Sequence, residues 1–107
     1  MTSVASNLQT LGIVLPAPAA PVANYVPWVI TGNLLVISGQ LSFGNDGKLA
    51  PAHIGKLGGT VSAADGQAAA RQCAINVLAQ AQAALGDLER ITRCVRLGGF
   101  INATPDY

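Results

Sequence analysis

The sequence has few charged residues and no cluster of charge of either sign. Charged residues make up 10% of the 107 residues, and the formal net charge is +1. Nucleic-acid-binding surfaces need clustered Lys and Arg, so no nucleic-acid partner is expected. No apolar run approaches the about 20 residues of a membrane span. The N-terminus has no basic residue ahead of an apolar block, so it does not resemble a signal peptide. These absences exclude a membrane partner and favour a cytoplasmic location.

Metal-binding and redox motifs are also missing. Cys73 and Cys94 are the only cysteines and lack CxxC spacing, so we expect two buried free thiols. His53 is the only histidine, and no acid or cysteine lies at ligand spacing from it, which predicts a solvent-facing loop residue. The glycines around Lys56 do not form the phosphate-binding motif GxxxxGK[ST]. No metal or cofactor is therefore expected.

What the chain does contain is apolar surface in excess. Hydrophobic residues make up 50% of the sequence and the mean hydropathy is +0.42. A chain of this length forms a single domain, residues 1–107, with room for one core. Such a small domain leaves much of its surface exposed. We therefore expect the remaining apolar surface to be covered by other subunits or by further chain.

The segment 31–40 predicts the centre of the fold. Leu34 to Ile37 lie between a Gly-Asn turn and a Ser-Gly pair, which indicates a short strand buried on both faces. Ser38 would offer a hydroxyl at the end of this strand. Gly39 would let a ligand or another backbone approach its N–H. The alternative is that the Ser-Gly pair only ends the strand.

The residues before this strand predict a connector and an edge strand. Residues 1–21 read as a short helix, Ser3 to Leu11, followed by an extended arm of prolines and alanines. Val22 to Ile30 is rich in β-branched and aromatic residues. Pro27 confines this segment to an edge strand or a bulge, which places Tyr25 near an edge. The turn at 31–33 would join the segment to the central strand as a hairpin.

The second half of the chain predicts a long helix and a further strand. Gly44 to Gly47 is a strong turn signal with short strand pieces possible on each side. Ser62 with Asp65 predicts the start of a helix over 62–85, and Gly86 predicts its end. Ile91 to Asn102 reads as a strand. The helical spacing favours a packing face made of Ala70, Cys73, Ala74, Val77, Leu78, Ala81 and Leu85.

This order of segments predicts an α+β fold with the helix packed on one face of a sheet. The sequence resembles those of the RidA family, also called YjgF or Rid. The segments that carry the resemblance are Ala17-Pro18 to Tyr25-Val26, Gly32-Asn33 to Ser38-Gly39-Gln40, Ala70-Arg71-Gln72 to Asn76, and Gly86-Asp87-Leu88. The resemblance covers nearly the whole chain from about residue 17 onward and fits a divergent branch of the family. It implies a chorismate-mutase-like fold that is incomplete at the C-terminus.

The resemblance also implies a function. Members of this kind hydrolyse reactive 2-imino or enamino acids to 2-keto acids and ammonia, as homotrimers with a site between subunits. By motif, Tyr25, Ser38 and Gly39 would line that site and contact a small imino or keto acid. The family's arginine, in an Arg-Ser motif, has no counterpart in this chain, so no catalytic residue is assigned and we expect this chain to be inactive on its own.

Two alternatives to this enzyme stay open. One is a trimeric module that binds a small metabolite without chemistry. The other is ribonuclease activity, which has been attached to the family. Low charge and the lack of paired His or Lys residues argue against a ribonuclease.

Overall fold

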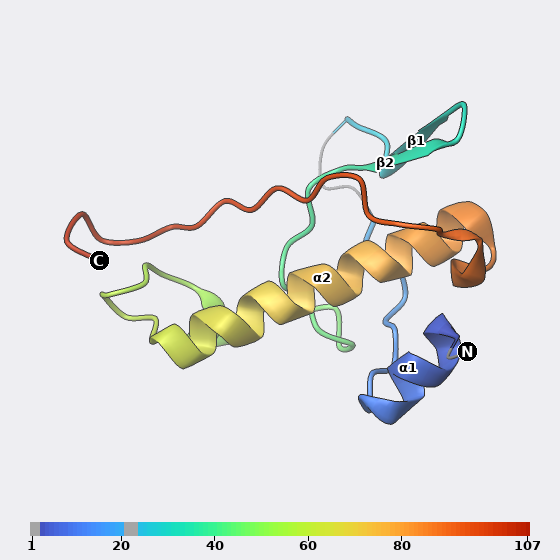
Figure 1. Cartoon of the computed structure of the whole chain (residues 1–107). Helices are drawn as coiled ribbons and strands as arrows, with labels where there is room; N and C mark the ends of the chain where they lie inside the picture. Colours follow the sequence, from blue (N-terminus) through green and yellow to red (C-terminus); the bar gives the residue numbers. More distant parts are fainter. Residues whose placement is uncertain (1–2, 21–23) are drawn as a thin grey trace.

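The computed structural model describes residues 3–20 and 24–107 and shows an α+β architecture. A long helix crosses the molecule, with a two-stranded sheet, a short helix and extended segments around it (Figure 1). The elements in chain order are α1 (Val4–Thr10), β1 (Trp28–Thr31), β2 (Leu34–Ile37), the 3₁₀ turn η1 (Pro51–His53), α2 (Ala63–Leu85) and the 3₁₀ turn η2 (Leu88–Arg90). The predicted fold class is confirmed.

Helix α2 begins and ends where the sequence predicts. The Ser62 side chain accepts a hydrogen bond from the Asp65 N–H at 3.1 Å, and its hydroxyl lies 3.0 Å from the Asp65 carboxylate. At the other end, Gly86 takes a left-handed conformation with φ 78°, and its N–H donates to the Gln82 carbonyl. A side chain at that φ would be strained, so glycine ends the helix cleanly.

The face that α2 buries differs from the predicted one. Of the predicted residues only Ala81 is buried, whereas Ala70 and Ala74 are exposed and the others are half-buried. The buried residues of the helix are Ile75, Asn76, Ala79, Gln80 and Ala81. The prediction was wrong because it chose the packing face by apolar spacing alone, whereas here the amide side chains of Asn76 and Gln80 form hydrogen bonds with the segments that cover the helix.

The predicted hairpin is formed, but it is short and thinly covered. Strands β1 and β2 pair antiparallel, with Trp28 opposite Ile37 and Val29 opposite Val36. Val29 and Val36 are 52% and 51% exposed, so the prediction of a strand buried on both faces is wrong. A two-stranded sheet covered from one side cannot bury both of its faces. Strand β1 begins only after Pro27, and residues 21–23, where the arm ends and the predicted strand begins, lie outside the described part.

The predicted strand at 91–102 is not formed. The chain leaves the C-terminal end of α2 and returns toward its N-terminal end as an extended trace (Figure 1). Every residue from 91 to 102 is exposed, including Leu97 at 75% and Phe100 at 104%. The β-branched composition favours an extended backbone, but a strand needs a hydrogen-bonded neighbour. Among the described residues, none supplies one before Asn102, at the very end of this segment.

The end of the chain contacts the loop that follows η1. The Leu57 N–H donates to the Asn102 carbonyl at 3.0 Å, and the Thr104 N–H donates to the Leu57 carbonyl at 2.9 Å. Gly58 lies beneath this contact with φ 84°, and a Cβ there would lie 2.5 Å from Thr104 Oγ1 and 2.9 Å from Tyr107 Cδ2. Close approach of two backbones therefore requires a glycine at this position.

The N-terminal helix α1 is anchored by Glu89 of η2, the turn that follows α2. The Glu89 carboxylate accepts hydrogen bonds from the N–H groups of Val4 and Ala5, at 2.7 and 3.1 Å. Ser3 caps the same helix through Ser6, as the sequence predicts for a helix beginning there. An acidic group at a helix N-terminus satisfies free N–H donors and interacts favourably with the helix dipole.

Candidate functional site

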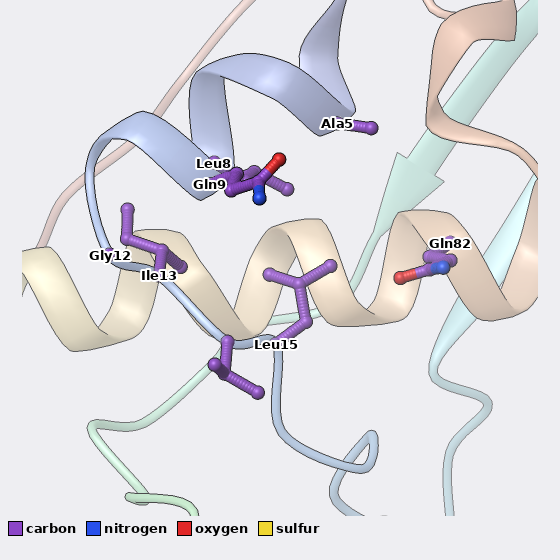
Figure 2. A pocket seen from close by; sticks show the side chains of 8 residues that line it. Ala5, Leu8, Gln9, Gly12, Ile13, Leu15 and Gln82 are labelled. Carbon is purple, nitrogen blue, oxygen red and sulfur yellow. The ribbon is translucent and has the colours of Figure 1, made fainter.

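The larger of two hollows lies between α1 and α2 and has little to orient a ligand. Its volume is about 520 Å³, and Figure 2 shows the side chains of Leu8, Leu15 and Gln82 around it. Apart from the amides of Gln9 and Gln82, its lining is aliphatic or glycine. Specific ligand sites combine apolar walls with a few convergent polar groups. The size of this hollow therefore does not make it the better candidate.

The smaller hollow brings together two of the three predicted site residues. Tyr25 and Gly39 both line it, and it has a volume of about 30 Å³, enough for one or two water-sized groups. We call it the Tyr25 pocket. Its lining comes from the arm, the two ends of the hairpin, the segment after β2 and helix α2: Ala19, Ala20, Tyr25, Pro27, Gly39, Gln40, Leu41, Phe43 and Gln80.

Ser38, the third predicted residue, is not among the lining residues. Its hydroxyl donates to the Val26 carbonyl at 2.6 Å, and its N–H donates to the Pro27 carbonyl at 3.0 Å. These bonds continue the pairing of the hairpin beyond β1 and hold the segment of Tyr25 beside that of Gly39. In this structure Ser38 positions the wall of the pocket, which agrees with the plainer alternative that the Ser-Gly pair ends the strand.

Amide side chains from α2 fix the opposite wall. Asn76 is 5% exposed, and its Nδ2 donates to the carbonyl oxygens of Leu41 and Phe43 at 2.7 and 2.8 Å. Gln80 Nε2 donates to the Ala19 carbonyl at 3.0 Å and lies 3.4 Å from Gln40 Oε1. Gln40 in turn donates to the Ser38 carbonyl at 2.9 Å. The arm, the segment after β2 and the helix are therefore joined around the pocket by directional hydrogen bonds.

The pocket is polar without being charged. Tyr25 is the only titratable residue that lines it, and it is 44% exposed. A lining of this kind can orient a small ligand through hydrogen bonds, but it supplies neither an acid–base group poised near neutral pH nor a cation for a carboxylate. Within residues 3–20 and 24–107, no group of three or more His, Cys, Asp or Glu side chains is arranged to hold a metal ion.

The two cysteines and His53 lie elsewhere. Both thiols are free, but Cys94 is exposed and Cys73 is only half-buried, so the prediction of two buried thiols was wrong for Cys94 and met only in part by Cys73. Cys94 is exposed because no described residue covers the segment that carries it. Burial raises the pKa of the Cys73 thiol. His53 is half-buried and its Nδ1 has no hydrogen-bond partner among the described residues, so it is not the solvent-facing residue that we predicted.

Sequence reasoning missed Gln40 and Gln80 as residues of the pocket. A signal for Gln80 was present in the helix: Gln72, Asn76 and Gln80 recur every four residues, which places their amides on one side of α2. Gln72 Nε2 lies 3.2 Å from Asn76 Oδ1. A regular stripe of amides on a largely apolar helix indicates a polar interface with another segment, and not a solvated face.

The fold and the sequence belong to a known family. The sequence matches the family described as "YjgF/chorismate mutase-like, putative endoribonuclease" over residues 5–106. The protein is therefore a member of the YjgF/chorismate-mutase-like family, as the resemblance implied. Among the described residues, none of the helices has both the length and the apolar character required to cross a membrane.

Particular relatives are similar over almost the entire chain. Protein TCP17 of Trypanosoma cruzi is 50% identical over 104 residues, which are 97% of this chain and 63% of TCP17. The crystal structure of Atu1372 from Agrobacterium tumefaciens, a protein of unknown function, has a TM-score of 0.82 at 46% identity, over 95% of this chain and 61% of that one. A "putative endoribonuclease" from Shewanella oneidensis MR-1 has a TM-score of 0.80 at 37% identity, over 86% and 59%. The chain spans 59 to 63% of these relatives.

Proposed function

We propose that this chain supplies the neutral wall of a small-molecule site that serves hydrolysis of 2-imino acids to 2-keto acids and ammonia. The observation that carries the proposal is the meeting of Tyr25, Gly39 and Gln80 at one pocket. These residues come from three separate segments, and hydrogen bonds from buried amides hold the segments together. The cation for the substrate carboxylate and the group that activates water are not in this lining, so the chain by itself binds without turnover.

The first test asks whether the Tyr25 pocket binds ligand. Gly39→Ala adds a methyl group to the lining; its Cβ would meet nothing within 4 Å, so the fold tolerates it. Gly98→Ala is the matched control, because its Cβ also lies in open space, on the exposed segment far along the chain. In NMR titrations with 2-oxobutanoate, Gly39→Ala should weaken binding and Gly98→Ala should leave it unchanged. Equal binding by both variants would refute the proposed site.

The second test concerns turnover. A threonine dehydratase reaction generates 2-iminobutanoate, and release of 2-oxobutanoate is followed with and without the chain. We expect no acceleration by residues 1–107. Acceleration would contradict the claim that a cation outside this lining is required.

One competing function is favoured by the uncharged lining: a module that binds a small metabolite and performs no chemistry. The distinguishing experiment fuses this chain to the part of TCP17 that lies outside the matched region and repeats both assays. Binding together with hydrolysis supports the deaminase. Binding without hydrolysis in the longer protein supports the module.

The same proposal includes assembly as a homotrimer, supported by apolar side chains that this chain leaves uncovered. Val29 and Val36 form an exposed cross-strand pair on the hairpin, and Leu97 and Phe100 are exposed on the extended segment. Contiguous exposed apolar surface is typical of an interface. Chromatography with light scattering should show three copies, and Val36→Lys should shift the population toward monomer. A wild-type monomer at high concentration would refute the trimer.

The ribonuclease function carried in the family's description is not supported by this chain. Its net charge of +1 provides no basic surface, and the pocket offers no pair of general acid and base. Ribonuclease activity that persists through stringent purification would overturn this conclusion. A cytoplasmic location fits the proposed chemistry and is tested by fractionation of the source cells.

A further inference from the structure

We propose that Gln80 is a ligand-binding residue whose side-chain oxygen accepts a hydrogen bond from the nitrogen of a ligand in the Tyr25 pocket. The inference rests on the proposed function and adds to it the means by which the site recognises nitrogen. No motif marks this residue, and it comes from the middle of α2.

The first observation is the burial of Gln80. It is 1% exposed and is the largest fully buried side chain among the described residues. Burying an amide is unfavourable unless both its donor and its acceptor find partners. A glutamine at such a position therefore requires an explanation.

The second observation is that the donor group of this amide has hydrogen-bond partners, whereas its acceptor oxygen has none among the described residues. Nε2 donates to the Ala19 carbonyl at 3.0 Å, and this bond fixes the orientation of the amide, because the flipped form would place two carbonyl oxygens against each other. Oε1 then has no hydrogen-bond partner among the described residues. This oxygen is buried, and Gln80 lines the Tyr25 pocket, which has room for only one or two water-sized groups. The nitrogen end of a ligand, and not the whole ligand, is therefore the partner that we infer for it.

The chemistry of the missing partner follows from the acceptor. An imino or amino nitrogen presents N–H groups to the Gln80 oxygen, whereas a keto oxygen or a carboxylate presents lone pairs and is repelled. Gln40 cannot replace it, since its Nε2 donates to Ser38 and its Oε1 lies against Gln80 Nε2. The pocket would therefore prefer the nitrogen-containing substrate over the keto product, which assists product release.

The test compares two ligands with the same carbon skeleton, 2-aminobutanoate as a stable stand-in for the imine and 2-oxobutanoate as the product. Binding to the wild-type chain is measured by NMR titration, and the ratio of the two affinities is compared with that of Gln80→Met. Methionine keeps the length of the side chain but lacks the amide. A hydrogen bond to a charged donor corresponds to roughly tenfold or more in affinity. We expect Gln80→Met to lose the preference for the amino ligand by about that factor while binding of the keto acid changes little.

Gln82→Met is the matched control, because Gln82 lies on the same helix, is exposed and does not line the pocket. It should keep the wild-type ratio. If Gln80→Met weakens both ligands equally, or changes neither, Gln80 has a structural role only and the inference is wrong while the proposed site stands. If the wild-type chain binds neither ligand, the proposed function itself fails.

A measurement on the wild-type protein keeps the test independent of whether Gln80→Met folds. In labelled protein the side-chain carbonyl carbon of Gln80 is assigned through its own bonds and followed during both titrations. A shift with 2-aminobutanoate and none with 2-oxobutanoate supports the inference. Equal shifts, or none, overturn it.

Discussion

Asn76 is predicted to be the residue that holds the wall of the pocket onto α2. Its Nδ2 donates to the carbonyl oxygens of Leu41 and Phe43 at 2.7 and 2.8 Å, and the side chain is 5% exposed. The substitution that isolates this role is Asn76→Leu, which keeps the branched shape of the side chain with some added volume and removes the donor. Both carbonyl oxygens would then lose their partner in a place that water reaches poorly.

The expected loss is large for a chain of this size. Each net hydrogen bond contributes about 0.5–1.5 kcal/mol, and a buried carbonyl left without a donor costs about 1–3 kcal/mol. Allowing for partial relaxation and the gain from burying leucine, Asn76→Leu should lower the free energy of unfolding by about 2–4 kcal/mol. Domains are stable by only about 5–15 kcal/mol, so this loss would be a substantial fraction of the total free energy of unfolding.

The assay is urea denaturation followed by circular dichroism, with Gln72→Leu as the control. Gln72 is half-buried and makes one bond at 3.2 Å to Asn76, so its loss should cost less than about 1 kcal/mol. The two variants should differ in transition midpoint without a change in slope. A midpoint for Asn76→Leu equal to that of Gln72→Leu would refute the reasoning.

Replacing Asn76 by the charged isostere aspartate should make the stability of the folded protein depend on pH, with a sign that can be predicted. In Asn76→Asp only the protonated acid can donate to a carbonyl, so the folded state raises the pKa of this carboxyl above its unfolded value. The folded protein then binds more protons than the unfolded chain, and its stability falls as the pH rises through the acidic range. Wild-type protein should show no such trend from this site.

Three further predictions concern other parts of the chain. Gly58→Ala should destabilise by about 1–3 kcal/mol more than Gly47→Ala in urea denaturation, because both have positive φ but only the former meets neighbouring atoms; equal losses would contradict this. Glu89→Ala should lower stability by about 1 kcal/mol by removing the acceptor of the α1 N–H groups, with Glu89→Gln falling between it and wild type. Cys94 should be alkylated faster than Cys73 at pH 8, as measured by mass spectrometry, because burial raises the pKa of Cys73; the reverse order would be incompatible with this structure.

Local signals predicted the boundaries of both helices well. Ser62 and Gly86 fixed the ends of α2 because caps and left-handed glycines are decided within a few residues. The segment 91–102 shows where such reasoning stops. Its composition favours an extended backbone and the backbone is extended, but whether it becomes a strand depends on a neighbour that no local pattern encodes.

The candidate site was likewise predicted in part and missed in part. Tyr25 and Gly39 were predicted through the resemblance, and the structure places both at one pocket. Gln80 was left out of the predicted packing face because apolar spacing was the only criterion applied to the helix. What buries it is a bond to the Ala19 carbonyl, 61 positions earlier in the chain, and a contact at that separation cannot be read from helical periodicity.

The row of amide side chains on α2, Gln72, Asn76 and Gln80, also fixes the position of the helix along its own axis relative to the segments that cover it. A translation by one turn, about 5.4 Å, would bring Gln72 opposite the carbonyls that Asn76 now contacts. Glutamine is one methylene longer than asparagine, so its amide would overshoot a pair of oxygens reached at 2.7 and 2.8 Å. A difference of one carbon atom between the two side chains thus favours one position of the helix along its axis. Apolar contacts alone would leave several such positions nearly equal in energy.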